Sequence, residues 1–196
     1  MDLYVGESQR ATNARDRRLL RDRRRGGPGG RRPRRPGGAA AGVFHVGPVA
    51  ETGPQQWRDM FAVNVIGLLV VTRAALPHLR RGTAPAVVTI SSMSGRRVPT
   101  AAGGVYSATK HAVHAIGDGL RLELRDERVR VTTIAPGFVR TAILDDWPDG
   151  PLRDRYSERM DSVGLDPDTV ADAVVHVLGL PAGVAVAEYA GTAVCQ

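Results

Sequence analysis

Residues 105–113 read VYSATKHAV and contain Lys110, the only lysine of the chain, four residues after Tyr106. The other 26 of the 27 basic side chains are arginine. On a helix, positions i and i+4 share a face, so the phenol and the ammonium would be neighbours. A cation beside a phenol favours the phenolate and lowers its pKa from about 10 toward working pH. Tyr106 is therefore a candidate general acid and base.

A tyrosine and a lysine at this spacing are often only a surface pair of little consequence. With four tyrosines and a single lysine in the chain, chance placement at this spacing has a frequency of roughly a few per cent. The composition therefore favours a functional pair over an accidental one.

Length and composition indicate one globular domain. The 196 residues are 42% hydrophobic and 24% charged, which is typical of a soluble protein with a substantial core. The single cysteine, Cys195, cannot form an internal disulfide, so we expect a reducing, cytoplasmic location. No apolar run reaches the length of a transmembrane helix, and the N-terminus lacks the apolar core of a signal peptide.

The basic charge is concentrated in one segment. Residues 1–38 hold 12 arginines and four acidic side chains, a net charge of +8, whereas residues 39–196 carry a net charge of −1. Residues 15–38 are rich in Arg, Gly and Pro and have little apolar content. We therefore expect residues 1–40 to be disordered. Without interleaved aromatic side chains, this segment does not predict nucleic-acid binding.

From residue 41 onward the chain alternates between helical and strand patterns. The predicted helices cover residues 55–80, 105–125 and 168–178, and the predicted strands cover residues 86–90, 129–134 and 184–189. This alternation is typical of βαβ units around a parallel sheet. The fold class is therefore α/β.

Polar side chains fall at the strand ends of this pattern. Ser92 follows the strand of residues 86–90, and residues 136–141, PGFVRT, follow the strand of residues 129–134. In open α/β sheets, ligands bind beyond the carboxyl ends of the strands. Asn64 lies within the first predicted helix, and Tyr106 and Lys110 open the second.

In this order, the motifs resemble those of the short-chain dehydrogenase/reductase family, over residues 42–196. The resemblance assigns a catalytic tetrad of Asn64, Ser92, Tyr106 and Lys110. It implies that the tyrosine exchanges a proton with the substrate oxygen and that the serine binds the substrate carbonyl. The lysine would tune the tyrosine and bind the nicotinamide ribose, and the asparagine would hold a water. Ser94 is an alternative to Ser92, and Asn64 could instead be a helix-bend residue.

The same resemblance implies an NAD or NADP cofactor and a small-molecule carbonyl or alcohol substrate. Thr141 would contact the nicotinamide carboxamide. Pairing of subunits in the family also implies a homo-oligomer through the helices of residues 55–80 and 105–125. The implied cofactor-binding residues are Gly42, Asn64, Tyr106, Lys110, Pro136, Gly137, Val139 and Thr141.

The phosphate-binding half of the family pattern is not found in this sequence. No Gly-x-x-x-Gly-x-Gly turn occurs, and residues 26–30, GGPGG, contain a proline and lie between arginines. Such a turn presents backbone N–H groups to the pyrophosphate. We therefore expect an incomplete Rossmann-like, doubly wound sheet, with the N-terminal βαβ half missing and residues 41–196 as its catalytic half. A frame error, a mis-assigned start or a truncated gene would explain the change in composition near residue 40.

Two other functions remain open. A halohydrin dehalogenase is a cofactor-free relative that pairs the tyrosine with arginine, and the lysine here argues against it. A non-catalytic fragment or dimerising subunit is the other alternative. The scattered histidines do not have metal-ligand spacing, so we expect no metal. We expect a loop over residues 142–165, with Trp147 and Tyr156, that forms part of the substrate wall. The sequence identifies neither the substrate nor NAD over NADP.

Overall fold

The computed structural model describes residues 2–6, 37–40 and 42–196 of the chain. Five parallel strands form one sheet in the order β2-β1-β3-β4-β5. They are β1 (Asp2–Gly6), β2 (Gly37–Ala40), β3 (Ala86–Ile90), β4 (Arg130–Pro136) and β5 (Glu188–Gly191). The parallel α/β fold expected from the sequence is therefore confirmed.

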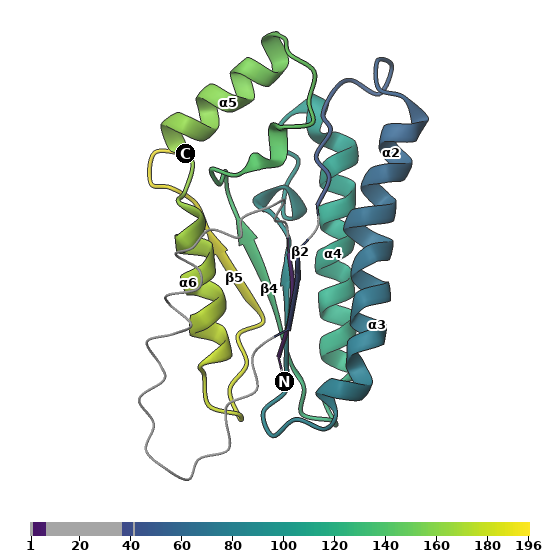
Figure 1. Ribbon diagram of the computed structural model, residues 1–196, viewed down its shortest axis with the longest axis vertical. Coiled ribbons are helices and arrows are strands. Elements are labelled where there is room, and N and C mark those ends of the chain that lie inside the picture. The colour runs from purple at the N-terminus through teal and green to yellow at the C-terminus, as the bar shows by residue number, and fades with distance from the viewer. Residues whose placement is uncertain (1, 7–36, 41) are drawn as a thin grey trace.

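Helices cover both faces of this sheet (Figure 1). One side carries a continuous helical run made of α2 (Pro54–Phe61), the π-helical segment η2 (Ala62–Gly67) and α3 (Leu68–Leu79), together with α4 (Gly104–Glu123). The other side carries α6 (Pro167–Leu178), while α5 (Pro151–Val163) lies beyond the carboxyl ends of the strands. This three-layer arrangement is the doubly wound architecture.

Alternate side chains of β3 supply the two cores. All five residues of β3 are buried, as expected for a central parallel strand covered on both faces. Val87 packs with α3, α4 and β4, and its neighbour Val88 packs with α6. The first cluster contains Leu79, Val87, Leu120, Leu124, Val129 and Val131. The second contains Val88, Ile90, Ile134, Ala173, Val174 and Val177.

Local signals explain where the helices begin. Pro54 and Pro167 occupy the first turns of their helices, where the missing N–H costs nothing. The carboxylate of Asp166 accepts a hydrogen bond from the backbone N–H of Asp168 at 3.0 Å, which caps α6.

The helical run from Pro54 to Leu79 is apolar and long enough to cross a membrane, judged by length and composition alone. This is contrary to our expectation from the sequence, although the core helices of soluble proteins pass the same test.

Two strands lie where the sequence predicted disorder. Asp2–Gly6 pairs with both Gly37–Ala40 and Ala86–Ile90, so part of residues 1–40 belongs to the sheet. Without a neighbour, β3 would leave its backbone groups unpaired in the interior, which is costly. Asp2–Gly6 meets this demand on one side of β3, and Gly37–Ala40 pairs with the other side of Asp2–Gly6 in spite of its weak strand propensity. The remainder of the basic segment, residues 7–36, lies outside the described residues.

The last strand begins later than the sequence pattern predicts. β5 covers Glu188–Gly191 rather than residues 184–189. The hydroxyl of Thr132 donates to the Val186 carbonyl at 2.7 Å, and the guanidinium of Arg121 donates to the Ala187 carbonyl at 3.0 Å. The Val186 carbonyl is thus bound to a side chain, whereas the Ala187 carbonyl also accepts the backbone N–H of Thr133 at 3.0 Å, where the ladder with β4 begins.

Candidate active site

The expected site lies where the carboxyl ends of β3 and β4 meet α4. Ser92 follows β3 by two residues, and Gly137 directly follows β4. Strands β3 and β4 are neighbours in the sheet, with Ile90 opposite Ile134. The sheet therefore brings the Ser92 turn and the segment after Pro136 to the same edge.

Tyr106 and Lys110 occupy one buried face of α4. Their side chains are only 6% and 2% exposed, and the Lys110 Nζ atom lies 5.6 Å from the centre of the Tyr106 ring. The hydroxyl of Thr109 donates to the Tyr106 carbonyl at 2.7 Å. The helical spacing thus places the phenol and the ammonium together in the interior, unlike a solvated surface pair.

Ser92 starts a short turn that is pressed against α4. It is the N-cap of the 3-10 turn η3 (Met93–Gly95), and its Oγ accepts a hydrogen bond from the Ser94 N–H at 3.1 Å. The neighbouring Ser91 hydroxyl donates to the Lys110 carbonyl at 3.1 Å. A Cβ at Gly95 would lie 2.7 Å from that same carbonyl, so only glycine permits this close approach.

Asn64 holds the chain after Gly42 against the helices. It is buried in η2, its Oδ1 accepts from the Val43 N–H at 2.8 Å, and its Nδ2 donates to the Val43 carbonyl at 2.9 Å. Nδ2 also lies 3.2 Å from the Thr109 hydroxyl oxygen. One amide therefore connects the segment after Gly42, the π-helical turn and α4. Single π-helical turns often mark functional sites.

An aromatic cluster flanks Tyr106. The Phe44 ring meets Tyr106 edge-on at 4.5 Å between centroids and stacks on Trp147 at 5.3 Å. Tyr156 of α5 completes the group at 5.5 Å from both Phe44 and Trp147. The Trp147 indole N–H donates to the Phe44 carbonyl. Phe44 is thus fixed next to the candidate acid and base by contacts from the loop before α5.

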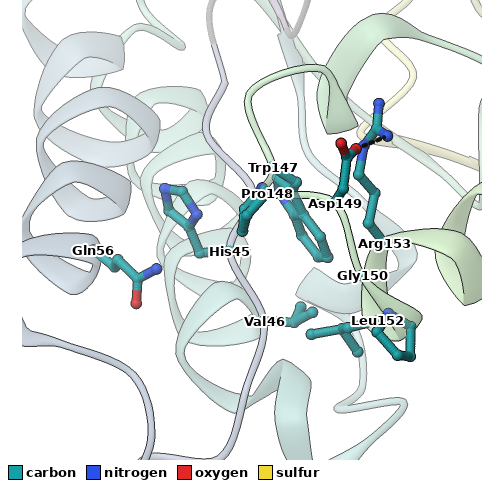
Figure 2. A pocket seen from close by; sticks show the side chains of 10 residues that line it. His45, Val46, Gln56, Trp147, Pro148, Asp149, Gly150, Leu152 and Arg153 are labelled. Carbon is teal, nitrogen blue, oxygen red and sulfur yellow. Dashed lines mark hydrogen bonds and ion pairs between the residues drawn. The ribbon is translucent and has the colours of Figure 1, made fainter.

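A cavity of about 220 Å³ lies on the far side of Trp147. Figure 2 shows Trp147 between His45 and the ion pair of Asp149 with Arg153, whose N···O distance is 2.8 Å. Gln56 and Leu152 also line this space. Its wall includes Trp147, which the sequence analysis placed in the substrate wall, whereas Tyr156 packs inside the aromatic cluster.

The segment after β4 binds a carboxamide of the chain itself. The side-chain oxygen of Gln196 accepts a hydrogen bond from the Phe138 N–H at 3.1 Å. A Cβ at Gly137 would overlap this carboxamide. Glycine at this position therefore leaves a cradle that accepts a flat amide group.

The other expected cofactor contacts are arranged around this cradle. Pro136 ends β4 and is buried, and Val139 pairs with Leu165. Thr141 is exposed at the start of the 3-10 turn η5 (Ala142–Leu144). Gly42 is buried at the beginning of the segment that Asn64 holds. Within the described residues, no three His, Cys, Asp or Glu side chains are grouped to hold a metal.

His114, one helical turn after Lys110, is a further residue at the site, to which the sequence pattern assigned no role. Burial lowers the pKa of its imidazole, opposed by the Glu188 carboxylate and by a hydrogen bond to the Ser92 backbone; His111 and Arg96 add to the lowering. Its spacing from Lys110 was the available signal, because positions i and i+4 share a helix face. Phe44 was also missed, and only the fold brings it to Tyr106.

Comparison with known proteins identifies the family. The short chain dehydrogenase model matches residues 39–151. The human dehydrogenase/reductase SDR family member 11 is 37% identical over 137 residues, covering 67% of this chain and 53% of the relative. An uncharacterized oxidoreductase of Staphylococcus aureus is 36% identical over 149 residues, covering 76% of this chain and 60% of the relative.

Solved structures share the fold. The closed form of a serine dehydrogenase complexed with NADP+ superimposes with a TM-score of 0.69 and 30% identity, covering 79% of this chain and 63% of that one. An alcohol dehydrogenase of the archaeon Thermococcus sibiricus, complexed with 5-hydroxy-NADP, gives a TM-score of 0.67 and 29% identity, with coverages of 80% and 61%.

The chain belongs to the short-chain dehydrogenase family. It spans less than two thirds of the length of these relatives and structural neighbours. The incomplete Rossmann-like fold expected from the sequence is in keeping with that partial coverage.

Proposed function

We propose that this chain carries the catalytic portion of an NAD- or NADP-dependent oxidoreductase that interconverts a small alcohol and its carbonyl. The observation that carries the proposal is the buried pair of Tyr106 and Lys110 beside the Ser92 turn. A buried ammonium is costly unless it is compensated, so its presence next to a phenol favours a functional arrangement. The structural neighbours complexed with NADP+ and 5-hydroxy-NADP support the choice of cofactor class.

The residues present fit the nicotinamide end of such a cofactor. The Gln196 carboxamide, which accepts a hydrogen bond from the Phe138 N–H, supports this fit, because nicotinamide carries the same primary amide group. We propose that Gly42, Pro136, Gly137, Val139 and Thr141 surround this end, as the family resemblance implies. Lys110 would donate to the ribose hydroxyls.

The proton chemistry would belong to Tyr106. When bound, the cofactor supplies the hydride acceptor or donor. In alcohol oxidation, the Tyr106 phenolate would take the hydroxyl proton of the substrate; in carbonyl reduction, the phenol would return that proton to the oxygen. Lys110 would favour the phenolate through its charge. Ser92 would donate a hydrogen bond to the substrate oxygen, and Asn64 would hold the wall that carries Phe44.

Apolar side chains near Tyr106 indicate where the substrate carbon skeleton would pack. Phe44 covers the edge of the Tyr106 ring, and Trp147 stacks behind Phe44. We propose that these rings exclude water from the reacting oxygen, which strengthens the electrostatic effect of Lys110.

The activity can be tested in two forms of the protein. The 196-residue chain and a chimera are each assayed for alcohol-dependent reduction of NAD+ or NADP+ at 340 nm, over a panel of small alcohols. In the chimera, residues 42–196 follow the N-terminal βαβ half of the serine dehydrogenase. We expect turnover in the chimera and its loss in the Tyr106→Phe chimera. A folded chimera that binds NADP+ but turns over no alcohol of the panel would contradict the proposal.

A second proposal concerns self-association. Four apolar side chains on the run from Pro54 to Leu79 are substantially exposed: Phe61 (40%), Ile66 (54%), Leu69 (41%) and Val70 (61%). A patch of this kind on a soluble domain is typical of an interaction surface. We propose a homo-oligomer that buries this face together with α4, and a cytoplasmic location in keeping with the free, exposed Cys195. This self-association would also serve the alternative function, a dimerising subunit without catalysis.

A further inference from the structure

His114 lies where α4, the Ser92 turn and β5 meet. It belongs to α4, one turn after Lys110, and its side chain is only 17% exposed. Its Nδ1 atom lies 3.9 Å from Oε1 of Glu188, the first residue of β5. The same carboxylate oxygen lies 3.2 Å from Nε of Arg96, which ends the Ser92 turn.

The imidazole also packs directly on that turn. A Cβ at Gly95 would lie 2.5 Å from Cδ2 of His114, so the backbone of the turn rests on the ring without a side chain between them. The other ring nitrogen, Nε2, is buried without a hydrogen-bond partner. In the charged imidazolium, Nε2 would carry an N–H group that is buried without an acceptor. Burying a charged, unpaired donor costs more than burying the neutral ring, so this environment favours neutral His114.

We propose that neutral His114 is a positioning residue that fixes the Ser92 turn against the helix of Tyr106 and Lys110. Its ring supports the backbone at Gly95, and its Nδ1 side faces the Glu188 carboxylate that also binds Arg96. The Ser92 turn and the helix that carries Tyr106 are thereby held against each other by one side chain.

Protonation of His114 is expected to loosen the turn. The charged groups that face the ring are Glu188 from β5, Arg96 from the turn, and His111 from its own helix, with burial as the largest influence. Burial, with minor contributions from His111 and Arg96, lowers its pKa below the ordinary 6.5 against the opposing effect of Glu188 and the Ser92 backbone. A histidine whose pKa is lower in the folded form binds more protons when released, so the turn loses stability as pH falls through about 6.5.

Hydrogen exchange in the 196-residue chain tests this directly. The reporters are the amides of Ser94, Gly95 and Arg96, which donate to Ser92 Oγ, the Ser92 carbonyl and the Met93 carbonyl. With intrinsic exchange rates divided out, we expect their protection to fall at least about threefold from pH 7.5 to pH 5.5. The His114→Gln variant removes the titrating ring, so its protection should not change over this range.

Two further variants sharpen the result. Glu188→Gln removes the charge that favours the imidazolium, so the loss of protection at pH 5.5 should become larger than in the unchanged chain. His111→Gln is the matched control, because His111 is exposed on the same helix and its Nδ1 contacts only the Ser107 carbonyl in the described contacts, at 2.8 Å. Because His111 is only a minor cause of the lowered His114 pKa, this variant should keep most of the pH dependence.

Three outcomes would overturn the proposal: pH-independent protection in the unchanged chain, unaltered pH dependence in the folded His114→Gln variant, or loss of the effect in His111→Gln. Should His114→Gln fail to fold, the Glu188→Gln comparison still decides, since protection as in the unchanged chain would exclude the mechanism. The importance for catalysis rests on the proposed role of Ser92. The exchange measurement uses no substrate or cofactor, so its result does not depend on the oxidoreductase assay. The proposed role of His114 can therefore be disproved while the proposed oxidoreductase activity is found, and the activity can be absent while the role of His114 is supported.

Discussion

The Nζ atom of Lys110 lies 5.6 Å from the centre of the Tyr106 ring, and both side chains are buried on one face of α4. A lysine whose only task was solubility would lie on the surface, where most lysines are found. The single lysine of the chain therefore lies beside the tyrosine that we propose as the acid and base. This arrangement leads to the first two predictions.

Replacement of Tyr106 by Phe should abolish turnover while preserving the fold. The ring keeps its edge-on contact with Phe44, and the substitution removes the hydroxyl group that carries the exchangeable proton. General acid–base catalysis typically contributes about 10²–10⁴-fold, so we expect the rate of the chimera to fall by at least about 100-fold. Urea unfolding should shift by less than about 1.5 kcal/mol. A variant that kept more than about a tenth of the original rate would exclude Tyr106 as the acid and base.

Lys110→Arg should not be a conservative change, although arginine is otherwise the cation of this chain. The planar guanidinium is bulkier than an ammonium and has a fixed donor geometry, and this site is only 2% exposed. We expect a large loss of turnover in the chimera and a displaced pH optimum, because the charge next to the phenol moves. The pH–rate profile is the measurement, and an unchanged profile and rate would mean that the lone lysine has no catalytic role.

The 196-residue chain should bind NAD(H) and NADP(H) only weakly. Its sequence contains no Gly-x-x-x-Gly-x-Gly turn to hold the pyrophosphate. Calorimetric titration should give no binding in the micromolar range, whereas the chimera should bind one of the two cofactors. Micromolar binding to the unmodified chain would show that another segment holds the pyrophosphate.

A charge on the exposed helix face should prevent self-association. Val70 is 61% exposed on α3, so Val70→Glu should leave the monomer folded but place a carboxylate in the proposed interface. Val175→Glu is the matched control, because Val175 is 52% exposed on α6, on the other face of the sheet. Light scattering should show a smaller assembly only for Val70→Glu. If both variants match the unchanged chain, α3 is not the interface.

Arg130 should contribute strongly to stability. Its guanidinium is buried and donates to the carbonyls of Val177 and Leu180 near the end of α6, and to that of Ala84 before β3. Arg130→Met would leave these carbonyls without their donor, and we expect the free energy of unfolding to fall by about 3 kcal/mol or more. Arg125→Met, on an exposed side chain, should change it by less than about 0.5 kcal/mol in the same denaturant titration. Equal effects of the two substitutions would contradict this role.

Local pattern was sufficient for much of the architecture. The β-branched run from Ala86 to Ile90 could only be a buried strand, and the Asp166–Pro167 pair marked the start of α6. The spacing of Tyr106 and Lys110 placed them on one helix face before any fold was known. Each of these signals lies within a few residues of the chain, where backbone sterics and hydrogen bonding act directly.

Other features depend on contacts between segments far apart in sequence. Gly37–Ala40 has poor strand propensity, yet it pairs with β1 because unpaired backbone groups at a sheet are costly. Phe44 meets Trp147 across about a hundred residues, and His114 meets Glu188 of the last strand. The sequence by itself therefore determined the helices near residues 55–80, 105–125 and 168–178, the central strands and the shared helix face of Tyr106 and Lys110, since these follow from local periodicity; it did not indicate α5, which lies in a stretch predicted as a loop. Only the tertiary structure decided the walls and supports of the site, because those contacts form when the sheet brings distant strand ends to one edge.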